Sequence, residues 1–164
     1  MLFRSFKVYL PRVDEAVESA AAAASKPAAP AKELSGRETI LLVEDEPELR
    51  ELTRTVLATR GYNVIEAMSA EGAERLASDR RDGAKIHLLL TDVIMPGVSG
   101  RELAKRVVAR QPSVRVLYMS GYTYNVIAEN GTLERGVAFL QKPFTPSALV
   151  EKVREVLDMV VSGR

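Results

Sequence analysis

Residues 88–97 read LLLTDVIMPG: three leucines and a threonine run directly into Asp92, and a Met-Pro-Gly turn follows. The apolar run predicts a strand over Ile86–Thr91 that is buried on both faces. Burying an unpaired carboxylate is costly. Asp92 is therefore expected where the strand ends, at a place that offers its charge a partner, and that place is a candidate functional site.

Composition limits the classes of protein that this chain can represent. Its 164 residues are 46% hydrophobic and 27% charged, as in soluble globular proteins, and they suffice for one domain plus a further segment. The absence of cysteine excludes disulfides and thiolate metal sites. Lys and Arg number 23 against 22 Asp and Glu, so the charge pattern typical of nucleic-acid binding is missing. No apolar run approaches a membrane span and the N-terminus lacks a signal-peptide pattern, so we expect a cytoplasmic protein.

The chain divides near residue 37. Residues 16–31 read AVESAAAAASKPAAPA, a stretch in which alanine dominates and two prolines interrupt any helix. Before it, Phe6, Val8 and Leu10 alternate with other residues in a strand pattern, although a single strand is not stable alone. We therefore expect a strand-bearing segment over residues 1–15, an Ala/Pro-rich linker over 16–37 and a folded domain over 38–161.

Strand and helix patterns alternate regularly through the folded domain. Short apolar runs predict strands over Thr39–Val43, Tyr62–Glu66, Ile86–Thr91, Val114–Tyr118 and Val137–Leu140. Amphipathic patterns with caps predict helices over Pro47–Arg60, Ala70–Arg81, Gly100–Arg110, Tyr124–Asn130 and Pro146 to about Val160. In the first of these helices the expected buried face consists of Leu49, Leu52, Val56 and Leu57. Strands that are apolar on both faces and alternate with helices indicate the α/β class, with an open, doubly wound parallel sheet covered on both sides.

The polar residues that follow these strands are expected to meet. In an open α/β sheet the ligand site lies beyond the carboxyl ends of the strands. The residues that follow the first, third, fourth and fifth strands are Glu44 and Asp45, Asp92, Ser120 and Lys142. Three close carboxylates repel one another, and a divalent cation and the lysine would relieve that repulsion. Oxygen ligands without sulfur select a hard ion such as Mg²⁺, and Mg²⁺ beside a lysine and a hydroxyl is typical of phosphoryl chemistry.

Four stretches, taken together, resemble one family. They are ILLVEDEP (40–47), LLLTDVIMPGVSG (88–100), LYMSGYT (117–123) and VAFLQKPFTP (137–146). From Thr39 to about Asp158 the chain resembles the receiver domain of response regulators, most of all the receivers of hybrid sensor histidine kinases. SFKVYLPR (5–12) is similar to the last strand of the kinase ATP-binding domain, so a chain derived from a hybrid kinase is expected. The resemblance implies a flavodoxin-like (βα)5 fold with strand order 2-1-3-4-5.

The same resemblance implies a role for each site residue. Asp92 would accept a phosphoryl group from a partner's phosphohistidine. Mg²⁺ would be held by Glu44, Asp45, Asp92 and the backbone carbonyl of Ile94. The phosphoryl group would be bound and sensed by Ser120, Lys142 and Phe139, which would switch the face made by the fourth helix, fifth strand and last helix. Hydrolysis would be modulated by Ile94 and Tyr122, and Pro143 is a candidate for a cis peptide bond.

The implied partner is a histidine kinase or a histidine phosphotransfer protein, with no nucleic acid and no membrane, and the chain would be a monomer or weak dimer. It would be no enzyme in its own right, but a phosphoacceptor that assists its own phosphorylation and dephosphorylation.

One alternative is a Mg²⁺-dependent phosphohydrolase with an aspartyl nucleophile. Such enzymes usually carry a second acid two residues after the first, where this chain has Ile94. The other alternative is a receiver-like interaction module that is not phosphorylated. His87, the only histidine, is expected to be structural.

Overall fold

The computed structural model describes residues 34–78, 85–121 and 137–159. Its strands are β1 (Thr39–Val43), β2 (Asn63–Ala67), β3 (Leu88–Asp92), β4 (Arg115–Ser120) and β5 (Ala138–Gln141). Its helices are α1 (Pro47–Ala58), α2 (Ala70–Ser78), α3 (Gly100–Arg110) and α5 (Pro146–Asp158). The predictions for residues 1–33, for Tyr122 and for the helix Tyr124–Asn130 fall outside the described residues. None of the helices in the described ranges is long and apolar enough to cross a membrane.

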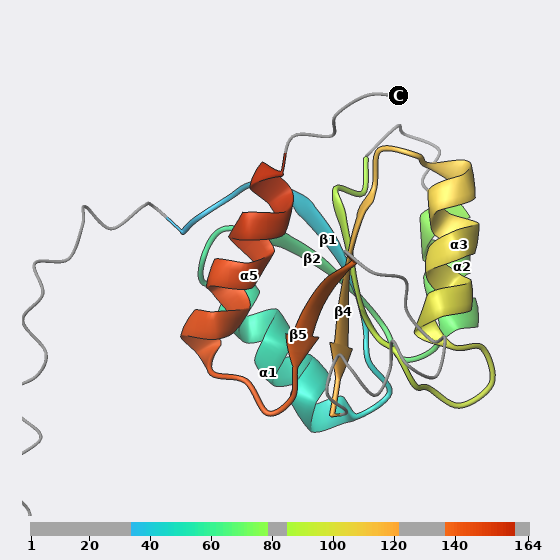
Figure 1. Cartoon of the computed structure of the whole chain (residues 1–164), viewed down its shortest axis with the longest axis horizontal. Helices are drawn as coiled ribbons and strands as arrows, with labels where there is room; N and C mark the ends of the chain where they lie inside the picture. The colour runs from blue at the N-terminus through green and yellow to red at the C-terminus, as the bar shows by residue number, and fades with distance from the viewer. Residues whose placement is uncertain (1–33, 79–84, 122–136, 160–164) are drawn as a thin grey trace, which may run out of the picture. The chain divides into compact units, whose positions relative to one another are not determined.

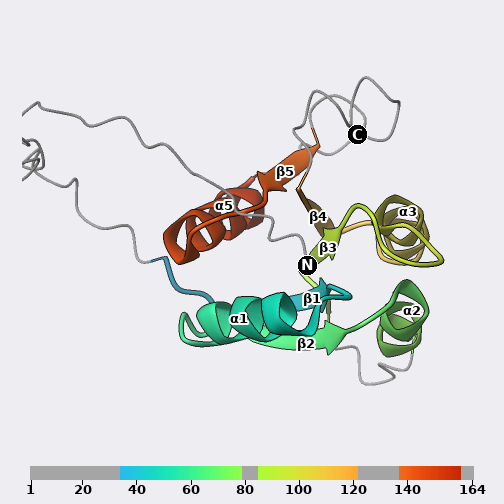
Figure 2. The ribbon, with the colours of Figure 1, turned by 90° about the horizontal axis from the view of Figure 1, so that it is seen from below.

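The strands form one parallel sheet in the order β2-β1-β3-β4-β5, which confirms the predicted fold class and strand order. Helices α1 and α5 cover one face of this sheet, and α2 and α3 cover the other (Figures 1 and 2). The chain therefore winds in both directions from β1. In doubly wound sheets of this kind the carboxyl ends of the strands carry the ligand site.

Alternating side chains of each central strand build two separate cores. In β1, Ile40 and Leu42 belong to the cluster under α1 and α5, whereas Leu41 and Val43 belong to the cluster under α2 and α3. All four side chains are fully buried. Successive side chains of a strand point to opposite faces, so a strand that is covered on both sides must be apolar throughout. This requirement explains the unbroken apolar runs that predicted β1 and β3.

The prediction was wrong in several details. The strand β3 ends at Asp92, one residue later than predicted, so the acid belongs to the strand itself. Leu52 was assigned to the buried face of α1, but its residue is 54% exposed, and Thr53 is buried in its place. The helix also ends at Ala58, earlier than Arg60, and Gly61 follows in the left-handed region with φ of 89°. The apolar spacing alone did not show whether Leu52 faces the sheet or the solvent.

Candidate functional site

The register of the sheet brings the polar ends of four strands to one edge. Val43 lies opposite Thr91. The residues that follow these two, Glu44 and Asp92, therefore lie side by side. Asp92 in turn lies opposite Met119 of β4, one residue before Ser120. Ser120 lies opposite Gln141, the residue before Lys142. The parallel pairing alone therefore gathers the residues that the sequence placed at strand ends.

Three carboxylates cluster at this edge. Glu44, Asp45 and Asp92 each offer one oxygen, and the three oxygens lie within 4.8 Å of one another. Their environments differ: Glu44 is buried, Asp92 is partly buried and Asp45 is exposed. The cluster is thus open to solvent on the side of Asp45 and closed on the side of Glu44. Burial raises the pKa of Glu44, because its bonds to Lys142 offset only part of the cost of removing the charge from water.

The ammonium of Lys142 joins two of these acids. Its Nζ donates to Oε2 of Glu44 at 2.7 Å and to Oδ2 of Asp92 at 2.5 Å. Burial alone would lower the pKa of Lys142, but the bonds to Asp92 and Glu44 outweigh burial and leave that pKa raised. Lys142 therefore carries a fixed positive charge inside the acid cluster. The peptide bond between Lys142 and Pro143 is cis, as predicted.

The position of Asp92 is set by its own backbone neighbours. The backbone N–H of Ile94 donates to Oδ1 of Asp92 at 3.0 Å, which orients the carboxylate. The hydroxyl of Thr91 donates to the carbonyl of Asp92 at 3.0 Å. Gly100, the first residue of α3, lies against that same carbonyl so closely that a Cβ there would overlap its oxygen. The first residue of α3 is thus packed against the backbone of Asp92.

The other predicted site residues lie around this centre. Ser120 is buried at the end of β4, and its carbonyl accepts the backbone N–H of Lys142 at 2.8 Å. Phe139 is partly buried, packs against the core under α2 and α3, and lies opposite Tyr118. The side chain of Ile94 is 58% exposed beside Asp92. Tyr122 lies outside the described residues.

The histidine lies at the opposite end of the sheet. His87 immediately precedes β3, and its Nδ1 accepts the backbone N–H of Thr39 at 3.0 Å. The backbone N–H of His87 donates to the carbonyl of Thr39 at 2.9 Å. The side chain therefore joins the first residue of β1 to β3, which is the structural role expected of it.

Sequence reasoning missed one residue of the site. Arg50, in the first turns of α1, donates from Nη1 to the carbonyl of Glu44 at 2.7 Å and reaches the carbonyl of Asp45 at 3.4 Å. Its partners at the acid cluster are backbone atoms, which every residue has. The sequence therefore carries no signal that could have singled out Arg50 among the charged residues of the helix.

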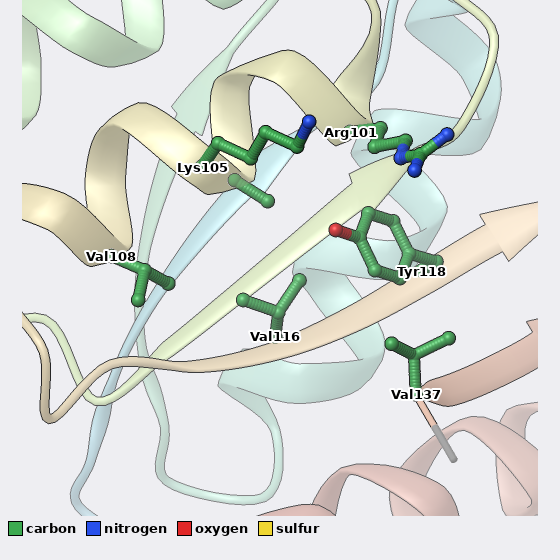
Figure 3. A pocket seen from close by; sticks show the side chains of 7 residues that line it. Arg101, Lys105, Val108, Val116, Tyr118 and Val137 are labelled. Atoms are coloured by element: carbon green, nitrogen blue, oxygen red, sulfur yellow. The ribbon is translucent and has the colours of Figure 1, made fainter. Parts of the chain in front are cut away.

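A cavity lies apart from the acid cluster (Figure 3). This cavity of about 320 Å³ is bordered by Arg101 and Lys105 of α3 and by Tyr118 of β4. Its apolar lining includes Val108, Val116 and Val137. None of the three clustered acids lines this cavity, so it is separate from the site at the strand ends.

Comparison with known proteins identifies the family. The response regulator receiver domain matches residues 40–154 of this chain. The sensor kinase CckA of Brucella abortus (strain 2308) is 35% identical over 157 residues, which are 94% of this chain and 16% of that kinase. The response regulator receiver protein CpdR of the same organism is 30% identical over 119 residues, which are 72% of this chain and 95% of CpdR. A crystal structure of the receiver domain from the hybrid histidine kinase CckA is 37% identical with a TM-score of 0.61, over 73% of this chain and 99% of that domain. This chain therefore belongs to the response regulator receiver domain family of two-component systems.

Proposed function

We propose that this chain receives a phosphoryl group on Asp92 from a phosphohistidine, with Mg²⁺ bound at the acid cluster. The observation that carries the proposal is the pair of bonds from Lys142 to Glu44 and Asp92 within a group of three carboxylates. A fixed ammonium beside a carboxylate nucleophile and an oxygen-lined cation site is the arrangement that phosphoryl transfer uses.

The residues present fit Mg²⁺. Their donors are carboxylate oxygens within 4.8 Å of one another, and Mg²⁺ prefers oxygen ligands. When all three acids are ionised, Lys142 offsets one of their charges and two remain. Glu44, Asp45 and Asp92 would hold the metal, and the carbonyl of Ile94 is proposed as a further ligand. Bound there, Mg²⁺ would offset the negative charge on the phosphoryl oxygens.

The transfer step follows from the position of Asp92. One carboxylate oxygen attacks the phosphorus while the bond from phosphorus to the donor's imidazole nitrogen breaks, so an acyl phosphate forms. The bond from Ile94 to Oδ1 holds the carboxylate in a fixed orientation before attack. Lys142, already within the cluster, can move from Asp92 to the new phosphoryl oxygens without crossing solvent. In this way the chain assists its own phosphorylation.

The lifetime and readout of the phosphoryl group are proposed to depend on four further residues, Ile94, Ser120, Tyr122 and Phe139. Ile94 and Tyr122 offer no acid or amide that could orient a water for hydrolysis, so the acyl phosphate should be long-lived. The Ser120 hydroxyl gains a charged acceptor when Asp92 is phosphorylated, and Phe139 on the neighbouring strand is the side chain proposed to respond. A ligand shifts such an equilibrium only through its different affinity for the two states, which the Ser120 and Lys142 contacts would supply.

We further propose that the phosphoryl donor is a histidine kinase or histidine phosphotransfer protein, and that the chain corresponds to part of a hybrid kinase. The similarity to sensor kinase CckA supports this, because it extends over 157 residues, beyond the receiver domain at 40–154. On this proposal residues 1–15 correspond to the end of the ATP-binding domain and residues 16–37 to a linker.

Incubation with a small phosphodonor and Mg²⁺, followed by intact mass measurement, tests the proposal. We expect one added phosphate in the wild type, loss of the added mass with hydroxylamine, and no labelling in Asp92→Asn. Full labelling of Asp92→Asn would overturn the assignment of Asp92. Rapid turnover of the phosphodonor would favour the phosphohydrolase, and an unlabelled wild-type chain would favour the interaction module.

A further inference from the structure

Arg50 stands between the acid cluster and strand β2. Its side chain is 16% exposed, and its Nη1 donates to the carbonyl of Glu44 at 2.7 Å and to that of Asp45 at 3.4 Å. On its other side, its Nε lies 3.9 Å from Oε2 of Glu66 in β2. One guanidinium thus connects the backbone of two consecutive clustered acids to the neighbouring strand.

These contacts act on a loop that carries two of the three clustered acids. Glu44 and Asp45 are adjacent, and their carboxylates approach each other and Asp92. The next residue, Glu46, is the N-cap of α1, and its side chain makes no capping bond. The backbone N–H of Glu44 donates to Ala67 at 3.2 Å and extends the pairing of β1 with β2 by one residue. Beyond that residue, Arg50 holds the loop through its bonds to the two carbonyls.

The direction of the two carbonyls matters for the site. The carbonyl carbon and the side chain of a residue are both bonded to its Cα, so the direction of one limits the directions open to the other. Fixing the carbonyls of Glu44 and Asp45 on the α1 side therefore restricts where their carboxylates can lie. Groups that orient metal ligands from outside typically change metal affinity by about 10- to 100-fold when they are removed.

We propose that Arg50 is a positioning residue that holds Glu44 and Asp45 in the arrangement that binds Mg²⁺. This inference rests on the proposed Mg²⁺ site. A second effect of Arg50 opposes it, because a guanidinium close to the cluster repels a cation. Pairing with Glu66 reduces that repulsion, whereas loss of the bonds to the loop would release both carbonyls from their fixed directions. The net effect of Arg50 is therefore to tighten Mg²⁺ binding.

Arg54 offers a matched control on the same helix. Its Nε lies 3.3 Å from Oε1 of Glu66, the same partner as that of Arg50, and its Nη2 bonds to Glu51. The hydrogen bonds found for Arg54 go to side chains of its own helix, not to the loop. Arg54→Met therefore removes a cation from Glu66, as Arg50→Met does, without releasing the loop carbonyls.

The experiment is a Mg²⁺ titration of the metal-free full chain, followed by amide and carbonyl NMR shifts. We expect Arg50→Met to weaken Mg²⁺ binding by about 10-fold or more, and Arg54→Met to change it by less than about twofold. The carbonyl shifts of Glu44 and Asp45 should move in the metal-free Arg50→Met chain and stay in place in Arg54→Met. Mg²⁺ affinity in Arg50→Met equal to or tighter than wild type would overturn the inference.

A conservative variant keeps the test decisive if Arg50→Met does not fold. Arg50→Lys retains the charge but lacks the planar guanidinium, whose Nη1 reaches the two loop carbonyls while its Nε faces Glu66. We expect it to bind Mg²⁺ about threefold or more weakly than wild type, and wild-type affinity would contradict the positioning role. Failure of the wild type to bind Mg²⁺ would instead refute the proposed metal site, so the two failures are distinguishable.

Discussion

Removing the charge of Lys142 should destabilise the folded domain by an amount that depends on pH. The Lys142→Met variant keeps the length of the apolar stem but leaves Glu44 and Asp92 without their shared cation. The side chains of Glu44, Asp92 and Lys142 are 1%, 13% and 16% exposed, so water cannot easily replace the lost contacts. Breaking a buried ion pair by deleting one partner typically costs about 3–5 kcal/mol.

We expect the lower end of that range, about 3 kcal/mol at neutral pH, because the cluster is open to solvent at Asp45. At a urea dependence of about 2 kcal/mol/M, such a loss lowers the unfolding midpoint by about 1.5 M. A double variant that also carries Glu44→Gln has no buried charge at position 44. It should therefore be more stable than Lys142→Met alone by about 1 kcal/mol or more.

The pH dependence follows from the pKa of Glu44, which burial already raises above 4.5 in the wild type. Without Lys142 only the backbone hydrogen bond from Glu46 still offsets burial, so the pKa of Glu44 rises further. A carboxyl whose folded-state pKa is raised stabilises the fold below its unfolded-state pKa, and that contribution is lost as pH rises through the folded-state value. The deficit of Lys142→Met should therefore grow between pH 4.5 and neutral pH.

Urea unfolding of the wild type, Lys142→Met and the double variant at several pH values measures these quantities. Saturating Mg²⁺ should recover more stability in Lys142→Met than in the wild type, because a bound cation takes over the role of the ammonium and binds only the folded state. A loss under about 0.5 kcal/mol, the range of ordinary surface substitutions, would refute the reasoning. So would a deficit that is independent of pH.

Two further substitutions test how neighbouring elements support the site. Gly100→Ala places a Cβ against the carbonyl of Asp92 and should cost about 1–3 kcal/mol of stability. In Gly72→Ala the new Cβ would have its nearest neighbour at 3.5 Å, so this variant should stabilise α2 by about 0.5–1 kcal/mol. Equal thermal midpoints for the two variants would contradict this expectation. Arg154→Met removes the 2.8 Å bond to Glu38, and although burial raises the pKa of Glu38, the bond from Arg154 and its backbone bonds lower it overall. The wild type should therefore lead Arg154→Met by about 1–2 kcal/mol at neutral pH and lose that lead as pH falls below 4.5, whereas a lead that persists in acid would refute the pairing.

The fold was predictable because each central strand is covered on both sides. The runs at 40–43 and 88–90 had to be apolar throughout, and the pattern of five such runs between helices left one class of fold. The proximity of Glu44, Asp92 and Lys142 was predictable because parallel strands end at a common edge of the sheet. The strand order, in contrast, was implied by the resemblance to receiver domains and not by the patterns.

What the sequence did not predict depends on contacts between side chains and backbone. The bonds from Arg50 to two carbonyls and the close approach of Gly100 to Asp92 involve atoms that every residue shares. The exposure of Leu52 is a related case, since a helix with more apolar positions than its buried face can hold leaves the choice to tertiary packing. Such features appear only when the elements are placed in space.

An NMR titration of the full chain with beryllofluoride, a phosphoryl mimic, in the presence and absence of Mg²⁺ tests whether the strand ends form one phosphoryl site. We expect a complex that forms only with Mg²⁺, with shift changes at Glu44, Asp92 and Lys142 and further changes at Ser120 and Phe139. Asp92→Asn should abolish all of them. Binding without Mg²⁺, or binding that persists in Asp92→Asn, would contradict the claim that these strand ends form one metal-dependent phosphoryl site.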